Sequence, residues 1–81
     1  MITPIQWATS YARNAEKHCM AAIAAAAAGD RETATELASK ARRQANHIDT
    51  DKDCQGDTTP VMMAIRNTAA VWADLAEEAT R

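Results

Sequence analysis

The sequence lacks phenylalanine altogether and has only two glycines, two prolines and two cysteines among its 81 residues. So few glycines and prolines exclude a collagen-like or low-complexity chain, and also an all-β fold, which needs many turns. The longest apolar run, residues 19–28, is mostly alanine and falls well short of the roughly 20 apolar residues that cross a bilayer. We therefore expect no membrane-spanning segment.

Large apolar side chains are also scarce. Of the 38 hydrophobic residues, 20 are alanine and two are cysteine, which leaves 16 large ones. These few side chains must already supply the core of a single domain, so a sizeable catalytic pocket is not expected. No basic N-terminal region followed by an apolar stretch is present. The sequence therefore predicts a cytoplasmic protein without a secretory signal.

The first segment with helical periodicity spans residues 4–28 and begins with several agreeing signals. Thr3 stands at the N-cap position, Pro4 occupies the first helical position, and Gln6 sits where a capping box needs Glu or Gln. Gly29 supplies the left-handed residue that typically ends a helix. This helix is the most strongly indicated element of the chain.

Two further helices are predicted. Asp30 is the expected N-cap of a helix over residues 31–48, and Thr59-Pro60 opens a third helix over residues 60–80. Residues 49–59 contain four aspartates, three threonines and no large apolar residue, which is typical of a connecting loop.

These segments predict an all-α protein with a single domain over residues 1–81. The short junction at Gly29 makes the first two helices an antiparallel hairpin, and the third helix completes a small three-helix bundle. We expect Arg66 to face water. The expected buried stripe of the third helix contains Val61, Ile65, Thr68, Ala69, Trp72, Leu75, Ala76 and Ala79.

Metal sites are not expected. The loop over residues 49–59 begins like a calcium loop, but Pro60 or Met62 stands where the bidentate glutamate is needed. The cysteines and histidines form no Cys-x-x-Cys or His-x-x-x-His pair for zinc. We therefore predict no metal and no other cofactor. Cys19 is interpreted as a small buried residue and Cys54 as an exposed thiol.

Catalysis is not expected either. No nucleophile, base and orienting group can be assembled from neighbouring positions, and no glycine-rich phosphate loop is present. Paired carboxylates occur only in the acidic loop and near the C-terminal end, where burial that could tune a pKa is not expected. The sequence favours a protein that is not an enzyme.

An aromatic edge follows the first helix. Trp7, Tyr11 and His18 lie along one side of it at helical spacing. One interpretation is a core boundary, where the rings pack while the polar groups of Trp and Tyr reach solvent. The other is a binding patch for a protein partner, because Trp and Tyr are the side chains favoured in such patches.

The only basic cluster consists of Lys40, Arg42 and Arg43, with His47 one turn later. The whole chain has a net charge of −2, whereas a domain that binds nucleic acid is normally basic. Lys40 and Arg42 also point in different directions around a helix. A solvated helix face is therefore favoured over a phosphate-binding stripe.

We expect a small binding protein that occupies a surface on another protein or protein complex and blocks or modulates it. Small helical proteins of this build include phage-encoded inhibitors such as anti-CRISPR proteins, and bacterial accessory factors. The alternative is a nucleic-acid-associated regulator that uses the basic cluster. A metal- or redox-responsive module built on the two cysteines and the acidic loop is a third hypothesis. The expected partner-binding residues are Trp7, Tyr11, His18, Lys40, Arg42, Arg43 and His47.

A homodimer is also predicted, because 16 large apolar residues make a thin core for three helices and small domains gain stability by oligomerising. The first helix should be longer than the second, which would leave its N-terminal aromatic residues partly uncovered. The residues expected at the dimer interface are Trp7, Tyr11, Met62, Met63 and Val71.

Overall fold

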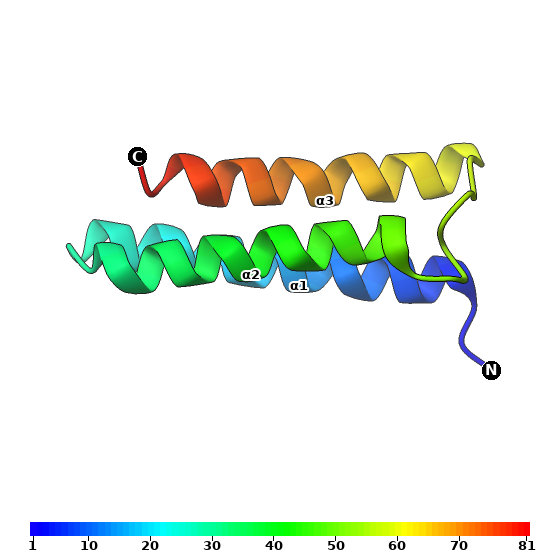
Figure 1. The fold of residues 1–81 in the computed structure, drawn as a ribbon, viewed down its shortest axis with the longest axis horizontal. Helices are drawn as coiled ribbons and strands as arrows, with labels where there is room; N and C mark the ends of the chain where they lie inside the picture. The colour runs from blue at the N-terminus through cyan, green and yellow to red at the C-terminus, as the bar shows by residue number, and fades with distance from the viewer.

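A computed structural model describes residues 1–81 as three α-helices without strands: α1 (Pro4–Ala27), α2 (Arg31–Thr50) and α3 (Pro60–Glu78). All three helices pack against one another, and α2 runs opposite to α1 and α3 (Figure 1). The predicted all-α three-helix bundle on an antiparallel hairpin is confirmed. None of the three helices combines the length and the apolar character that a membrane crossing requires.

Helix α1 begins as the sequence predicts. The Thr3 side chain accepts a hydrogen bond from the Gln6 backbone N–H at 3.2 Å, and the Gln6 side chain accepts one from the Thr3 N–H at 2.8 Å. This reciprocal capping box satisfies two of the backbone donors that a helix start leaves free. Gly29 follows the helix with φ +81°, the left-handed conformation expected of it.

The helix ends differ from the predicted bounds by one or two residues. Helix α2 continues to Thr50, two residues beyond the expected end, and α3 stops at Glu78. The end of α2 is set by Asp51, whose carboxylate accepts a hydrogen bond from the Asp53 N–H at 2.8 Å and so favours a turn. The connecting loop is therefore residues 51–59, shorter than predicted.

The core consists mainly of alanine. Ten of the 14 buried residues are alanines, and the largest fully buried side chains are Ile48 and Met62, followed by the two cysteines. Small side chains on facing surfaces let helix backbones approach closely, so there is little space between the helices for larger ones. Most of the large apolar residues therefore lie at the margins of the core or outside it.

The buried stripe of α3 is rotated relative to the predicted one. It consists of Met62, Ala69, Ala73 and Ala76, of which Ala69 and Ala76 were predicted. Val61 and Leu75, which were expected inside, are 58% and 46% exposed. Trp72 and Ile65 are only half-buried, and Thr68 is exposed. Alanine-to-alanine packing against α1 and α2 fits the narrow space between the helices and turns the larger side chains of α3 outward.

Cys54 is buried rather than exposed, which corrects the prediction. The loop over residues 51–59 folds across one end of the bundle, and Cys54 packs there with Ile48 and Met62. Its thiol donates a hydrogen bond to the carbonyl oxygen of Pro4 at 3.5 Å. The loop therefore contributes to the core, although its polar composition does not predict this.

Arg66 does not face water as predicted but holds this loop in place. Its guanidinium donates hydrogen bonds to the carbonyl oxygens of Cys54 at 3.2 Å and Asp57 at 3.1 Å. Its Nε lies 2.8 Å from a carboxylate oxygen of Asp49, near the end of α2. One side chain of α3 thus ties together α2, the loop and α3.

We predict that Arg66→Ala lowers the free energy of unfolding by about 1–3 kcal/mol, because two partly buried loop carbonyls lose their donors. The neighbouring exposed Asn67 provides the matched control, and Asn67→Ala is expected to stay within about 0.5 kcal/mol of the unmodified protein. Urea unfolding followed by circular dichroism measures both values. Equal unfolding midpoints for the two variants would contradict the role given to Arg66.

Candidate partner-binding surface

Three aromatic rings form a row across α1 and α2. The Trp7 ring stacks on that of Tyr11 with centroids 6.3 Å apart. The rings of Tyr11 and His47 meet edge to face, with centroids 5.3 Å apart. Trp7 and Tyr11 are four residues apart and so share one side of α1. The antiparallel course of α2 then places His47 beside Tyr11. Trp7 and His47 are exposed, whereas Tyr11 is half-buried between them.

Tyr11 is fixed by its hydroxyl group. The hydroxyl donates a hydrogen bond of 2.7 Å to the carboxylate of Asp51, at the end of α2. This bond is the main reason why the pKa of Asp51 lies below its usual range and why the pKa of Tyr11 is raised. Both groups therefore keep, at neutral pH, the protonation states that make the bond, and the ring holds one orientation.

A basic hollow continues from this row along the same side of the bundle. It is a shallow depression of about 370 Å³ between α1 and α2, and no hydrophobic residue lines it. Burial, and then the positive charges of Lys40, Lys17 and Arg43, lower the pKa of His18. His18 is therefore neutral at neutral pH and can donate one hydrogen bond and accept another. The lining residues are His18, Lys40, Arg43, Gln44 and His47.

Most of the predicted partner-binding residues thus lie on one surface, which we call the α1/α2 face. His47 belongs to both the aromatic row and the basic hollow and so joins them. Gln44 was missed by the sequence analysis, although it follows Lys40 by one helical turn; its side chain accepts a hydrogen bond from Asn14 at 3.2 Å. The α1/α2 face consists of Trp7, Tyr11, His18, Lys40, Arg43, Gln44 and His47.

Arg42 is separated from the other basic residues. Its guanidinium points toward α3, where it binds the carboxylate of Glu77 with distances of 2.6 and 3.0 Å and also pairs with Asp74. These contacts raise the pKa of Arg42 and lower that of Glu77. Arg42 therefore links α2 to α3 and is not part of the α1/α2 face, contrary to the prediction.

The residues predicted for a dimer interface do not form one surface. Met62 is fully buried and cannot contact another molecule, which corrects that assignment. Met63 lies beside Arg66, whose Nη1 is 3.0 Å from its sulfur. Val71 is 54% exposed on α3, away from the aromatic row of α1 and α2.

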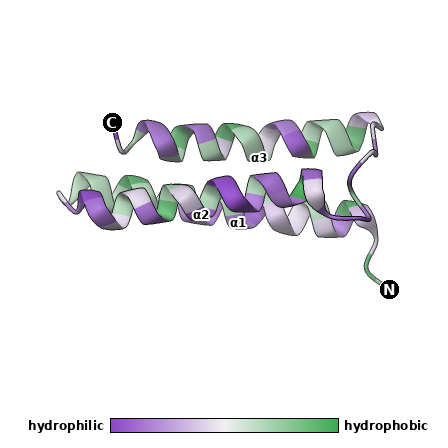
Figure 2. Ribbon diagram, viewed as in Figure 1, coloured by the Kyte–Doolittle hydropathy of each residue, from purple (hydrophilic) through white to green (hydrophobic).

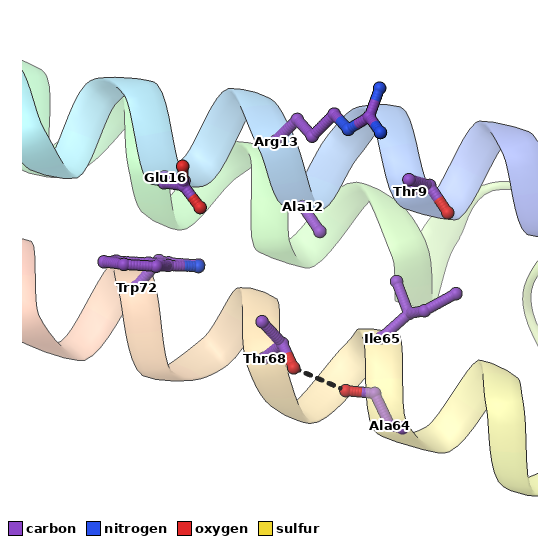
Figure 3. Close-up of a pocket in the computed structure, with 8 residues that line it drawn as sticks. All are labelled: Thr9, Ala12, Arg13, Glu16, Ala64, Ile65, Thr68 and Trp72. Atoms are coloured by element: carbon purple, nitrogen blue, oxygen red, sulfur yellow. Dashed lines mark hydrogen bonds between the residues drawn. The ribbon is translucent and has the colours of Figure 1, made fainter.

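A second hollow, not anticipated from the sequence, lies between α1 and α3. This α1/α3 groove has a volume of about 270 Å³. In Figure 3 Ala12, Ile65 and the ring of Trp72 lie between the two helices. Arg13 and Glu16 lie on α1 above them, with the Arg13 guanidinium turned away from α3. The lining residues are Thr9, Ala12, Arg13, Glu16, Ala64, Ile65, Thr68 and Trp72.

Metal ligands and the two cysteine thiols are the remaining candidate groups. No cluster of three or more His, Cys, Asp or Glu side chains is close enough to hold a metal ion. Cys19 and Cys54 are both free and buried, and burial raises the pKa of each thiol. Comparison of the chain with known protein families, curated proteins and solved structures finds no match.

The electrostatic coupling inside the basic hollow can be measured directly. We predict that Lys40→Met raises the pKa of His18 toward its ordinary value, because a neighbouring positive charge no longer opposes protonation. The rise is partial, since burial is the larger cause and remains. A pH titration of the His18 ring protons by NMR measures the change. Lys52→Met, in the loop, removes the same charge as a control and should leave the pKa of His18 unchanged; equal pKa values in both variants would contradict the arrangement.

Proposed function

We propose that the protein acts by binding another protein through its α1/α2 face, and that it blocks or modulates this partner. The observation that carries the proposal is the junction at His47 of an exposed aromatic row with a basic hollow. Aromatic side chains supply most of the energy of many protein interfaces, and charged groups around them provide orientation and specificity.

The chemistry of this face indicates what the partner presents. An apolar group of the partner would pack on the exposed ring of Trp7, and a carboxylate would meet Lys40 and Arg43 at the other end. Tyr11 is already held by Asp51, so binding loses little side-chain freedom there. The favoured partner is a protein surface that combines apolar and acidic groups. A phage-encoded inhibitor, such as an anti-CRISPR protein, is one form that this role takes.

A capture experiment tests the proposal. The tagged protein is incubated with a lysate of the native host, and bound proteins are quantified by mass spectrometry. We expect Trp7→Ala and Lys40→Glu each to reduce capture of the partner, Trp7→Ala by about 30-fold if it acts as a hot spot worth about 2 kcal/mol. Circular dichroism verifies that each variant keeps its helices.

Matched variants elsewhere provide the controls. Met63→Ala shortens an exposed apolar side chain on α3, and Lys52→Glu reverses a charge in the loop. Both are expected to capture the partner as the unmodified protein does. Capture that is equal for all four variants, or the absence of any enriched protein, would contradict the proposed binding face.

The alternative, a nucleic-acid-associated regulator, is less favoured because Arg42 is engaged with Glu77 and Asp74. Only Lys40 and Arg43 then remain as permanent charges of the basic cluster. We predict that short DNA and RNA duplexes bind only non-specifically at about 0.15 M salt, as measured by fluorescence anisotropy. Sequence-dependent binding in the submicromolar range would instead support the alternative.

A further inference from the structure

Helix α3 carries a second stripe of residues besides the one that enters the core. The stripe begins at Val61 and ends at Leu75, and its members alternate in steps of three and four residues. All five are exposed, and three of them are large and apolar. This spacing is typical of a seam along which one helix packs against another. The outer seam of α3, as we call it, consists of Val61, Ala64, Thr68, Val71 and Leu75.

The outer seam is continuous with the α1/α3 groove, because Ala64 and Thr68 belong to both. On α1, Met20 and Ile23 are 56% and 41% exposed. They follow the groove residue Glu16 by four and seven positions, so they extend the same side of α1. Figure 2 shows hydrophobic residues along the whole length of α3, whereas α2 is largely hydrophilic. The outer seam, the groove, Met20 and Ile23 together form what we call the α1/α3 face.

The size of this face matches that of a protein interface. The molecule measures 40 × 21 × 15 Å, so one long side offers on the order of 800 Å², the area that each partner contributes to a standard interface. Covering this face would also bury large apolar side chains, of which the monomer buries few. Apart from the cysteines, Ile48 and Met62 are the only large side chains that the monomer buries fully. Exposed apolar residues that lie next to one another, as on this face, are typical of an interaction site.

The charges on the face indicate what covers it. The groove has two charged side chains, Arg13 and Glu16, which lie three residues apart on α1. Neither forms an ion pair within the chain. A surface with one cation and one anion side by side is complementary to itself when a two-fold axis passes between them, because each charge then meets its opposite in the second copy.

We propose that the α1/α3 face binds a second copy of this chain in an antiparallel two-fold dimer. The axis crosses α3 between Thr68 and Val71, so that Ala64 packs against Leu75 of the second copy and Thr68 against its Val71. These layers pair a smaller side chain with a larger one, as interdigitating helices require. The same axis places Arg13 near Glu16 of the second copy. This interaction lies on a different side of α1 from the α1/α2 face and does not depend on the function proposed for that face.

Sedimentation equilibrium of the purified protein from micromolar to millimolar concentration tests the dimer. We expect the mass to rise with concentration from 8.7 kDa toward twice that value. Val71→Glu, which adds a charge in the seam, should weaken self-association about tenfold or more. Met63→Glu adds the same charge at an exposed apolar residue of the same helix outside the seam, and should leave it unchanged.

A charge exchange tests the two-fold pairing. Arg13→Glu and Glu16→Arg should each weaken the dimer, because each places like charges opposite each other across the axis. The double variant restores opposite charges and should regain the dimer. If either residue only stabilised its own chain, the double variant would not be expected to recover the dimer.

Three results would overturn the proposal. A single species of 8.7 kDa at every concentration excludes the dimer. Dissociation by Met63→Glu but not by Val71→Glu places the contact on another surface. A double charge variant that stays as weak as the single ones rules out the antiparallel pairing. If Trp7→Ala loses partner capture but still dimerises, the result concerns the α1/α2 face alone. The two proposals can therefore fail independently.

Discussion

Close approach of the three helices through alanine is the constraint on which the other features of this protein depend. Ten alanines form most of the buried core, and they leave so little space between the helices that few larger side chains fit inside. The hydrophobic contribution of each alanine is small, so the core gains stability from the number of close contacts rather than from large buried groups. Ile48 and Met62 are the exceptions, and both lie at the end of the bundle that the loop covers.

The same constraint explains why polar side chains connect the helices. Where alanines bring the backbones together, long side chains at the margins can reach across to the next element. Arg42 binds Glu77 of α3, and Arg66 reaches the loop and Asp49 near the end of α2. Hydrogen bonds to charged groups contribute more than neutral ones, which matters in a domain with so small a core. These contacts at the margins reinforce the rotation of α3 that the alanine packing selects.

The sequence predicts the local features well because their causes are local. Thr3 and Gln6 meet within one turn, and Gly29 needs only its own backbone conformation, so the helix order and starts follow from neighbouring residues. Arg42 and Glu77 are 35 residues apart, and the partner of such a side chain depends on how α3 is rotated. Apolar spacing alone does not determine that rotation, because α3 has two stripes at helical spacing. The size of Trp72 favours a rotation that buries its ring, whereas alanine packing buries the neighbouring Ala73 and leaves Trp72 half-buried.

The aromatic and basic residues were predicted as separate patches for a related reason. Trp7 and Tyr11 are neighbours on one helix, but their junction with the basic residues depends on where His47 lies across the α1–α2 hairpin. The tight turn at Gly29 restricts this alignment but does not fix it. The Tyr11–Asp51 hydrogen bond then fixes it, since Asp51 ends α2 and Tyr11 lies in the first half of α1.

Helix α1 separates the two candidate binding surfaces, with consequences for how they work together. Tyr11 and His18 lie on its side toward α2, whereas Arg13 and Glu16 lie on its side toward α3. A dimer formed through the α1/α3 face therefore leaves the α1/α2 face of each copy uncovered. Two identical binding faces held in one rigid assembly engage a partner with repeated or symmetric sites more strongly than either face alone, because the second contact becomes intramolecular. In the proposed dimer, self-association and partner binding would thus reinforce each other on a symmetric partner and would stay independent on a monomeric one.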